Sequence, residues 1–213
     1  MPLIAIVSGS PAPASRTAAL ARLIGEELAA KGCAVERLDI RELPAESVLG
    51  ARTDDPAVDA ALRLVERADG VVLVTPVYKA AYSGLMKTFL DLVPQSGLDG
   101  KVVLPMGVGG TLAHLLAIDY ALRPVLASMG CPHVLGAVFL LDVWLPRTAA
   151  GGVELDPTEA RHRVSNALEQ LAMRLRLRTA ADVAAIDCAQ SGTGGARKAF
   201  SLKDSVETVR GAR

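Results

Sequence analysis

Cysteine is scarce in this sequence. Its 213 residues include three, Cys33, Cys131 and Cys188, and none belongs to a CxxC pair. An odd number of widely spaced cysteines argues against a disulfide framework and against a structural zinc site. No His or Asp spacing suggests a metal site or a catalytic triad either. We therefore expect free thiols in a reducing compartment and no metal.

Net charge and long apolar runs are also absent. The 23 basic and 23 acidic residues cancel, which argues against a nucleic-acid partner because such a protein needs a basic face to neutralise phosphates. The same balance counts against a small electron carrier that docks through strong charge complementarity. No run approaches the roughly 18 apolar residues of a membrane span, and the first residues lack the basic region of a signal peptide. We expect a cytoplasmic protein without a membrane partner.

Short apolar runs rich in Val and Ile alternate with amphipathic segments along the chain, and this alternation indicates an α/β fold with a parallel sheet. The predicted strands span residues 3–8, 34–38, 70–75, 101–106 and 133–140. The predicted helices span residues 17–31, 56–68, 83–92, 111–129 and 156–177. Right-handed crossovers favour a flavodoxin-like, five-stranded sheet of order 2-1-3-4-5 with helices on both faces. We assign residues 1–178 to this domain and 179–213 to a C-terminal extension, whose Gly-rich part after Ser191 predicts a partly disordered tail.

The loop after the first predicted strand has the composition of a phosphate site. Ser10, Ser15 and Thr17 offer hydroxyls, Arg16 offers a guanidinium, and the following helix offers free N–H groups. The loop has neither the G-x-G-x-x-G of a dinucleotide fold nor the Gly-Lys-Ser/Thr of a P-loop, so the expected ligand is a monophosphate such as FMN. The alternative is an ordinary loop in which a serine caps the helix.

Two further loops belong to the same edge of the predicted sheet, where ligands of such folds bind. The loop 75–84 carries Tyr78 and Tyr82, two of only three tyrosines in the chain, which could line a planar ring. The alternative is that they pack at a helix start or a subunit contact. The loop 107–111 (Gly-Val-Gly-Gly-Thr) allows the main chain to approach a flat ligand, although glycines also serve tight turns.

Six segments of the chain resemble the NADPH-dependent FMN reductase family, and within it the reductases of bacterial alkanesulfonate monooxygenase systems. The resemblance covers about residues 3–175. The matching segments are 9–11 with 15–16, 68–70, 75–84, 100–105, 109–111 with 113–117, and 119–122 with 124–126. The resemblance implies FMN and NADPH (or NADH) as cofactors, a homodimer or homotetramer, and hydride transfer to FMN. It also implies a partner monooxygenase that receives the reduced flavin.

The resemblance assigns the flavin contacts residue by residue. It places the FMN phosphate at Ser10, Ser15, Arg16 and Thr17. It places one edge of the isoalloxazine ring beside Pro76, Val77, Tyr78, Lys79, Ala80 and Ser83. It places the other edge at Gly109, Gly110 and Thr111. Broader relatives often carry Asn-Gly where this chain has Lys79-Ala80.

Tyr120 lies in the middle of a predicted helix, shortly before Pro124. In the alkanesulfonate-type reductases the matching tyrosine resembles a one-residue insertion that makes a π-bulge at a tetramer interface, and such bulges often mark function. The alternative is that Pro124 alone bends an ordinary helix. The resemblance favours the bulge.

Catalysis by this family requires no acid or base from the protein, because the cofactors carry the hydride chemistry. We therefore assign no catalytic residue. His114 is a candidate acid–base group, but a structural histidine in the first turn of a helix is the favoured interpretation. The alternative functions are a reductase of quinones, azo dyes or chromate with bound FMN, a flavodoxin-like electron carrier, and an FMN-binding regulatory module.

Overall fold

The computed structural model describes residues 1–12 and 14–191. The chain divides into two units, Met1–Thr179 and Ala180–Arg213, and the fold below is that of the first. The tail expected after Ser191 lies outside the described residues. No helix in the described part of the chain is long and apolar enough to cross a membrane.

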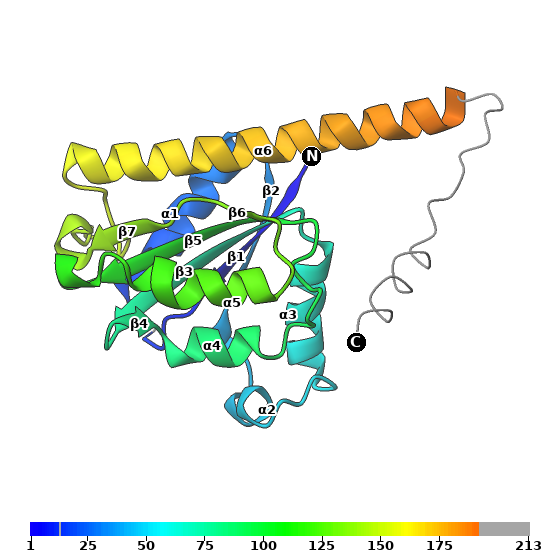
Figure 1. Ribbon diagram of the computed structural model, residues 1–213. Coiled ribbons are helices and arrows are strands. Elements are labelled where there is room, and N and C mark those ends of the chain that lie inside the picture. The colour runs from blue at the N-terminus through cyan, green and yellow to red at the C-terminus, as the bar shows by residue number, and fades with distance from the viewer. Residues whose placement is uncertain (13, 192–213) are drawn as a thin grey trace, which may run out of the picture. The chain divides into compact units, whose positions relative to one another are not determined.

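One mixed sheet forms the centre of the first unit, and its main path is β2-β1-β3-β5-β6 (Figure 1). The pairs along this path are parallel. The strands are β1 (Leu3–Ser8), β2 (Ala34–Asp39), β3 (Gly70–Tyr78), β4 (Ala81–Tyr82), β5 (Val102–Gly109), β6 (His133–Val134) and β7 (Val138–Leu141). The flavodoxin-like class and the predicted strand order are confirmed. The predicted number of five strands is wrong, because the sheet has seven.

The two extra strands have separate causes. β4 pairs antiparallel with the end of β3 in a short hairpin. The predicted strand 133–140 is divided into β6 and β7, which pair with the two ends of β5. The carbonyl oxygen of Val103 accepts a hydrogen bond from the N–H of Leu135. In a continuous parallel ladder, the N–H of residue 105 would then donate to the carbonyl oxygen of Leu135. Residue 105 is a proline without an N–H, so the ladder breaks there.

Helices cover both faces of the sheet (Figure 1). On one face, α1 (Arg16–Ala30) and α6 (Thr158–Ser191) pack against side chains such as Ile4, Ile6 and Leu104. The other face is covered by α3 (Pro56–Arg67), α4 (Gly84–Leu90) and α5 (Arg123–Ser128). Both faces of the central strands are therefore buried, which explains their continuous apolar runs.

Several of the other elements also depart from the prediction. The connection after β2, predicted as polar and irregular, contains a 3₁₀ turn η1 (Ile40–Glu42) and the short helix α2 (Ala45–Leu49). The last helix extends to Ser191, beyond the predicted end near residue 177. The strand β7 leads into a 3₁₀ turn, η4 (Asp142–Trp144).

The predicted helix 111–129 is not continuous. It consists of a 3₁₀ turn η2 (Leu112–His114), a π-helix η3 (Ile118–Leu122) and α5. Tyr120 lies within the π-helix, and Pro124 lies in the first turn of α5. The segment therefore has the bulged geometry expected at Tyr120, and the proline occupies a first-turn position where its missing N–H costs little.

Candidate functional site

The loop after β1 leads directly into the N-terminus of α1. Ser15 is the N-cap of α1, and its hydroxyl accepts the N–H of Ala18 over 2.9 Å. Ser10 is 1% exposed and Thr17 is also buried, in the first turn of α1. Arg16 is half-buried, and its Nε donates to the carbonyl oxygen of Leu145 over 3.0 Å. The four predicted phosphate residues therefore lie within one turn of a helix N-terminus or in the loop before it, where an anion is favoured.

Ser83 joins the first loop to the second. Its buried hydroxyl, 2% exposed, donates to the carbonyl of Gly9 over 2.6 Å and accepts the N–H of Met86 as the N-cap of α4. Its own N–H donates to Thr75 Oγ1 over 3.0 Å. The resemblance places Ser83 beside the ring, whereas in the structure its hydroxyl is engaged within the protein and holds the two loops together.

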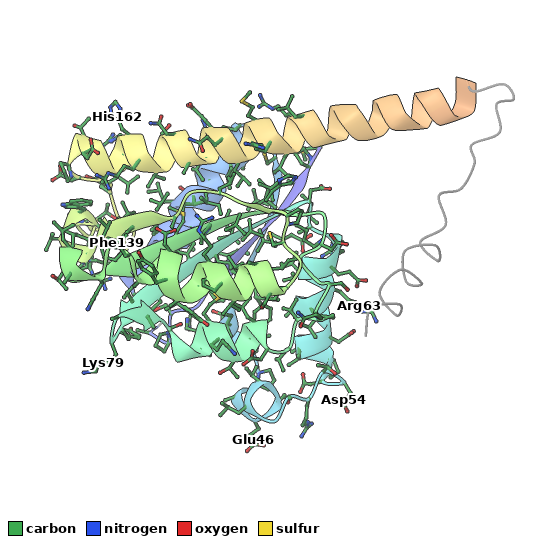
Figure 2. The ribbon with its side chains drawn as sticks, viewed as in Figure 1. Glu46, Asp54, Arg63, Lys79, Phe139 and His162 are labelled. Carbon is green, nitrogen blue, oxygen red and sulfur yellow. The ribbon has the colours of Figure 1, made fainter. Side chains whose placement is uncertain are left out.

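The second loop is a strand end followed by a tight hairpin. Pro76 and Val77 are buried residues of β3, and Tyr78 ends that strand with its side chain 52% exposed. Lys79 and Ala80 form the turn with φ of 51° and 61°, the pattern of a type I′ turn. Figure 2 shows Lys79 at the outer end of this hairpin.

The two tyrosines of this hairpin have different environments. Tyr82 packs against the core on the α4 face, and burial raises the pKa of its hydroxyl. Tyr78 is exposed at the edge of the sheet. Tyr78 is therefore the tyrosine that is accessible to a planar ligand. Tyr82 instead packs at the start of α4, which was the alternative role considered for these tyrosines.

The third loop is shorter than its sequence suggests. Gly107 and Gly109 belong to β5, and a Cβ at these positions would lie 2.7 Å from Ile118 and 2.9 Å from Phe139, respectively. These two glycines therefore accommodate the protein's own side chains, and the prediction of a glycine loop over 107–109 is wrong. Gly110 differs, because a Cβ there would meet only an Asp142 oxygen at 3.9 Å. Thr111, also exposed, caps η2.

These three segments lie together at one edge of the sheet. Gly9 bonds to Ser83 and, through its N–H, to the carbonyl of Val74 at 2.9 Å. A Cβ at Gly109 would lie 3.5 Å from Val77 Cβ, which places β5 against the hairpin strand. The structure thus brings the predicted phosphate loop and both predicted ring segments to the carboxyl ends of β1, β3 and β5, where ligands of doubly wound folds bind.

Arg147 and its neighbours are the part of the site that sequence reasoning missed. Arg147 Nη2 donates to the carbonyl oxygen of Ala14, within the phosphate loop. Leu145, two residues earlier, accepts from Arg16. These residues follow β7 and are far from the loop in sequence, so no local pattern marks them. Their chain position after the last strand of the sheet is the one signal that could have indicated them.

His114 and the cysteines offer little for catalysis. The Nδ1 atom of His114 is buried without a hydrogen-bond partner among the described residues, in the 3₁₀ turn after Thr111. Burial raises the pKa of the thiols of Cys33 and Cys131, which keeps them protonated. The side chain of Cys188 lies outside the described residues. Among those residues, no group of three or more His, Cys, Asp or Glu is placed to hold a metal.

The site's donors fit the two ends of FMN. A dianionic phosphate suits the N-terminus of α1 with its hydroxyls and guanidinium. A flat ring suits the open backbone at Gly110 and the exposed face of Tyr78. The fold and this arrangement define a flavodoxin-like oxidoreductase.

Comparison with known proteins identifies the family within this class. The family model of NADPH-dependent FMN reductases matches residues 2–145. The chain therefore belongs to the NADPH-dependent FMN reductase family, and it is an FMN reductase with FMN and NAD(P)H as its cofactors.

Individual relatives agree with this assignment. The FMN reductase (NADPH) of Escherichia coli K12 is 45% identical over 136 residues, which are 64% of this chain and 71% of that protein. The FMN reductase (NADPH) of Pseudomonas putida KT2440 is 43% identical over 140 residues, 66% of this chain and 71% of its own. The apo structure of the NADH:FMN oxidoreductase EMOB superposes with a TM-score of 0.74 at 34% identity, covering 82% of this chain and 90% of that one.

Proposed function

We propose that this FMN reductase releases reduced FMN to a separate flavin-dependent monooxygenase of the alkanesulfonate type. The observation that carries the proposal is the π-helix Ile118–Leu122, which interrupts the helix after the third site segment. The sequence resemblance associates such a bulge at Tyr120 with the reductases of alkanesulfonate monooxygenase systems. An ordinary proline bend would have left an α-helix before Pro124.

The protein's part in the reaction is positioning. When bound, FMN supplies a ring nitrogen that accepts hydride, and the nicotinamide supplies the hydride. Ser10, Ser15, Arg16 and Thr17 hold the phosphate and so fix one end of the flavin. Pro76 to Ala80 flank one edge of the ring, and the segment from Gly109 to Thr111 flanks the other. These contacts hold the ring in place for stacking of the nicotinamide, which is the main requirement of the step.

The ring side of the site is open, and this favours exchange of flavin over permanent binding. Tyr78, Lys79, Ala80, Gly110 and Thr111 are all exposed. A ring held against these groups keeps contact with solvent, so release requires no opening of the core. A reductase that supplies flavin to another enzyme needs such release in every turnover.

The apolar surface next to the site supports self-association of the chain. Leu112, Leu115, Leu116 and Tyr120 are all exposed, and Tyr120 is 78% exposed. Exposed apolar side chains gathered on one short segment are typical of a protein interface. We propose a homodimer or homotetramer in which this segment is a contact between copies, in a cytoplasmic setting.

An anaerobic assay tests the proposed function. Protein purified without flavin is mixed with NADPH or NADH and FMN, and the oxidation of the nicotinamide is followed. Ultrafiltration then separates free from bound flavin. We expect multiple turnovers and reduced FMN in the filtrate, because the proposed product is free reduced flavin. Reduced flavin that stays with the protein contradicts the proposal.

The same assay with other acceptors tests the main alternative. A reductase of quinones, azo dyes or chromate would keep FMN bound and turn over faster with those acceptors than with FMN. Lack of nicotinamide oxidation with any added flavin would instead favour an electron carrier.

A further inference from the structure

A short hairpin after β7 covers the phosphate loop. Its arms meet in an antiparallel bridge between Arg147 and Val153. Its turn is closed by Thr148, whose N–H donates to the Gly152 carbonyl over 3.1 Å. Leu145, Val153 and Leu155 are buried in the core on the α1 face. The hairpin is thus anchored at its base, and its arm carrying Arg147 lies against the loop before α1.

Arginines connect this hairpin to the phosphate loop in both directions. Arg16 donates from the loop to Leu145, and Arg147 donates from the hairpin to Ala14. A third arginine, Arg22, reaches the Gly151 carbonyl over 3.4 Å from further along α1. All three partners are neutral carbonyls, so these bonds fasten the hairpin without neutralising any charge.

The charges of Arg16 and Arg147 are not balanced by nearby acids. Among the described residues, no ion pair within 4.0 Å involves either guanidinium. Two positive charges therefore flank a helix N-terminus that is itself positive. Such an arrangement is unfavourable for the protein alone and becomes favourable when a dianion is bound between them.

We propose that Arg147 is a second phosphate-binding cation of the flavin site. It acts with Arg16 to make the enzyme select flavins that carry a 5′-phosphate. This inference rests on the proposed FMN site at the N-terminus of α1. The guanidinium already lies at Ala14, one residue before the capping Ser15, and the side chain is exposed. A guanidinium suits this task because it donates two parallel hydrogen bonds to phosphate oxygens.

Equilibrium binding of oxidised flavins tests this role without any turnover. FMN and riboflavin are titrated separately into flavin-free wild-type protein and Arg147→Gln, and the quenching of flavin fluorescence gives each Kd. A lost charge-assisted contact to phosphate weakens FMN binding about tenfold or more. The affinity for riboflavin, which has no phosphate, should stay within about twofold of wild type, because only the phosphate contact is removed. Arg147→Lys should fall between wild type and Arg147→Gln, since lysine keeps the charge and loses the paired geometry.

Arg22→Gln is the matched control. It removes the same kind of arginine-to-carbonyl bond between α1 and the hairpin, at a point further from the phosphate loop. We expect its ratio of FMN to riboflavin affinity to match wild type. Thermal unfolding of each flavin-free variant confirms that it is folded.

The possible outcomes separate this inference from the proposed function. If Arg147→Gln weakens FMN and riboflavin equally, Arg147 only holds the hairpin and the inference is wrong. If Arg16→Gln loses FMN selectivity while Arg147→Gln keeps it, the phosphate site stands and the role of Arg147 is overturned. If the wild-type protein binds FMN no better than riboflavin, the phosphate site itself fails, and the proposed site fails with it.

Discussion

Arg123 donates through Nη2 to the carbonyl oxygen of Leu135 over 2.8 Å, where the edge of the sheet is interrupted. Its Nη1 also reaches the carbonyl of Val134 over 3.2 Å. In a continuous parallel ladder the Leu135 carbonyl would accept from residue 105, and Pro105 has no N–H to give. A side chain that follows the π-helix thus replaces a missing sheet hydrogen bond and holds the two edge strands in place.

Replacing Arg123 by methionine should destabilise the protein by about 1–3 kcal/mol, because the two carbonyls lose their donor while a similar volume is kept. Urea unfolding measures the change. Arg63→Met is the matched control, since Arg63 forms an i,i+4 ion pair with Asp59 on the exposed side of α3. The control should unfold at nearly the wild-type urea concentration. Equal losses of unfolding free energy in both variants would show that Arg123 has no special role where the edge of the sheet is interrupted.

The turn at Lys79 and Ala80 should be a point of backbone strain. Both residues have positive φ, which costs a residue with a Cβ about 1 kcal/mol and suits asparagine better than lysine. We expect Lys79→Asn to raise the free energy of unfolding by about 0.5–1 kcal/mol. Lys79→Val should lower it, because a β-branched residue is least tolerant of this conformation. Thermal midpoints compare the three proteins, and a stabilising valine would exclude turn strain as the cause.

Substitution by alanine should affect protein stability differently at the two neighbouring glycines, Gly109 and Gly110. Gly109→Ala places a Cβ 2.9 Å from the Phe139 ring and should cost about 1–3 kcal/mol of stability through overpacking. Gly110→Ala meets no such contact, so its stability should stay near wild type. If the flavin ring lies against Gly110, the added methyl group weakens FMN binding. Unfolding and fluorescence titration together separate the two effects, and an unchanged FMN affinity in Gly110→Ala would place the ring elsewhere.

Replacing Tyr120 by alanine should leave flavin bound more tightly, as a fixed prosthetic group. Alanine has the highest helix propensity and favours return of the π-helix to an α-helix, next to the segment proposed to hold one edge of the ring. The absorbance spectrum of the purified variant measures the bound flavin directly. A Tyr120→Ala protein that releases flavin as readily as wild type would contradict this role for the π-helix.

Local pattern predicted the strands and the main helices well, and the right-handed rule for crossovers then limited the strand order. The buried run from Gly70 to Thr75 and the Asp55-Pro56 start of α3 were recognisable without neighbours. The edge strand was mispredicted because the effect of Pro105 depends on which strand lies beside it. The residue pattern after Thr111 predicted a single helix, and only the family resemblance indicated the bulge at Tyr120, because a π-helix differs from an α-helix by a single inserted residue.

In the candidate site too, the sequence indicated only the features whose residues are close together along the chain. The loop proposed to bind phosphate was suggested by Ser10, Ser15 and Arg16, which are close in sequence. Gly107 and Gly109 were predicted as loop and belong to β5, where the space they leave is taken by Ile118 and Phe139 from distant parts of the chain. Arg147 was missed because it lies 133 residues from its partner Ala14.

Residue patterns alone were enough to predict the alternation of strands and helices and the family, and to suggest the loop proposed to hold a phosphate. Strand pleat, helix periodicity and capping act over a few residues, and each leaves its mark on the chain itself. Three-dimensional packing decided which groups face one another: the hairpin over the phosphate loop, the arginine at the broken edge and the glycines packed against Ile118 and Phe139. Those relationships join residues far apart in sequence, and their energies exist only when the folded chain brings the partners into contact.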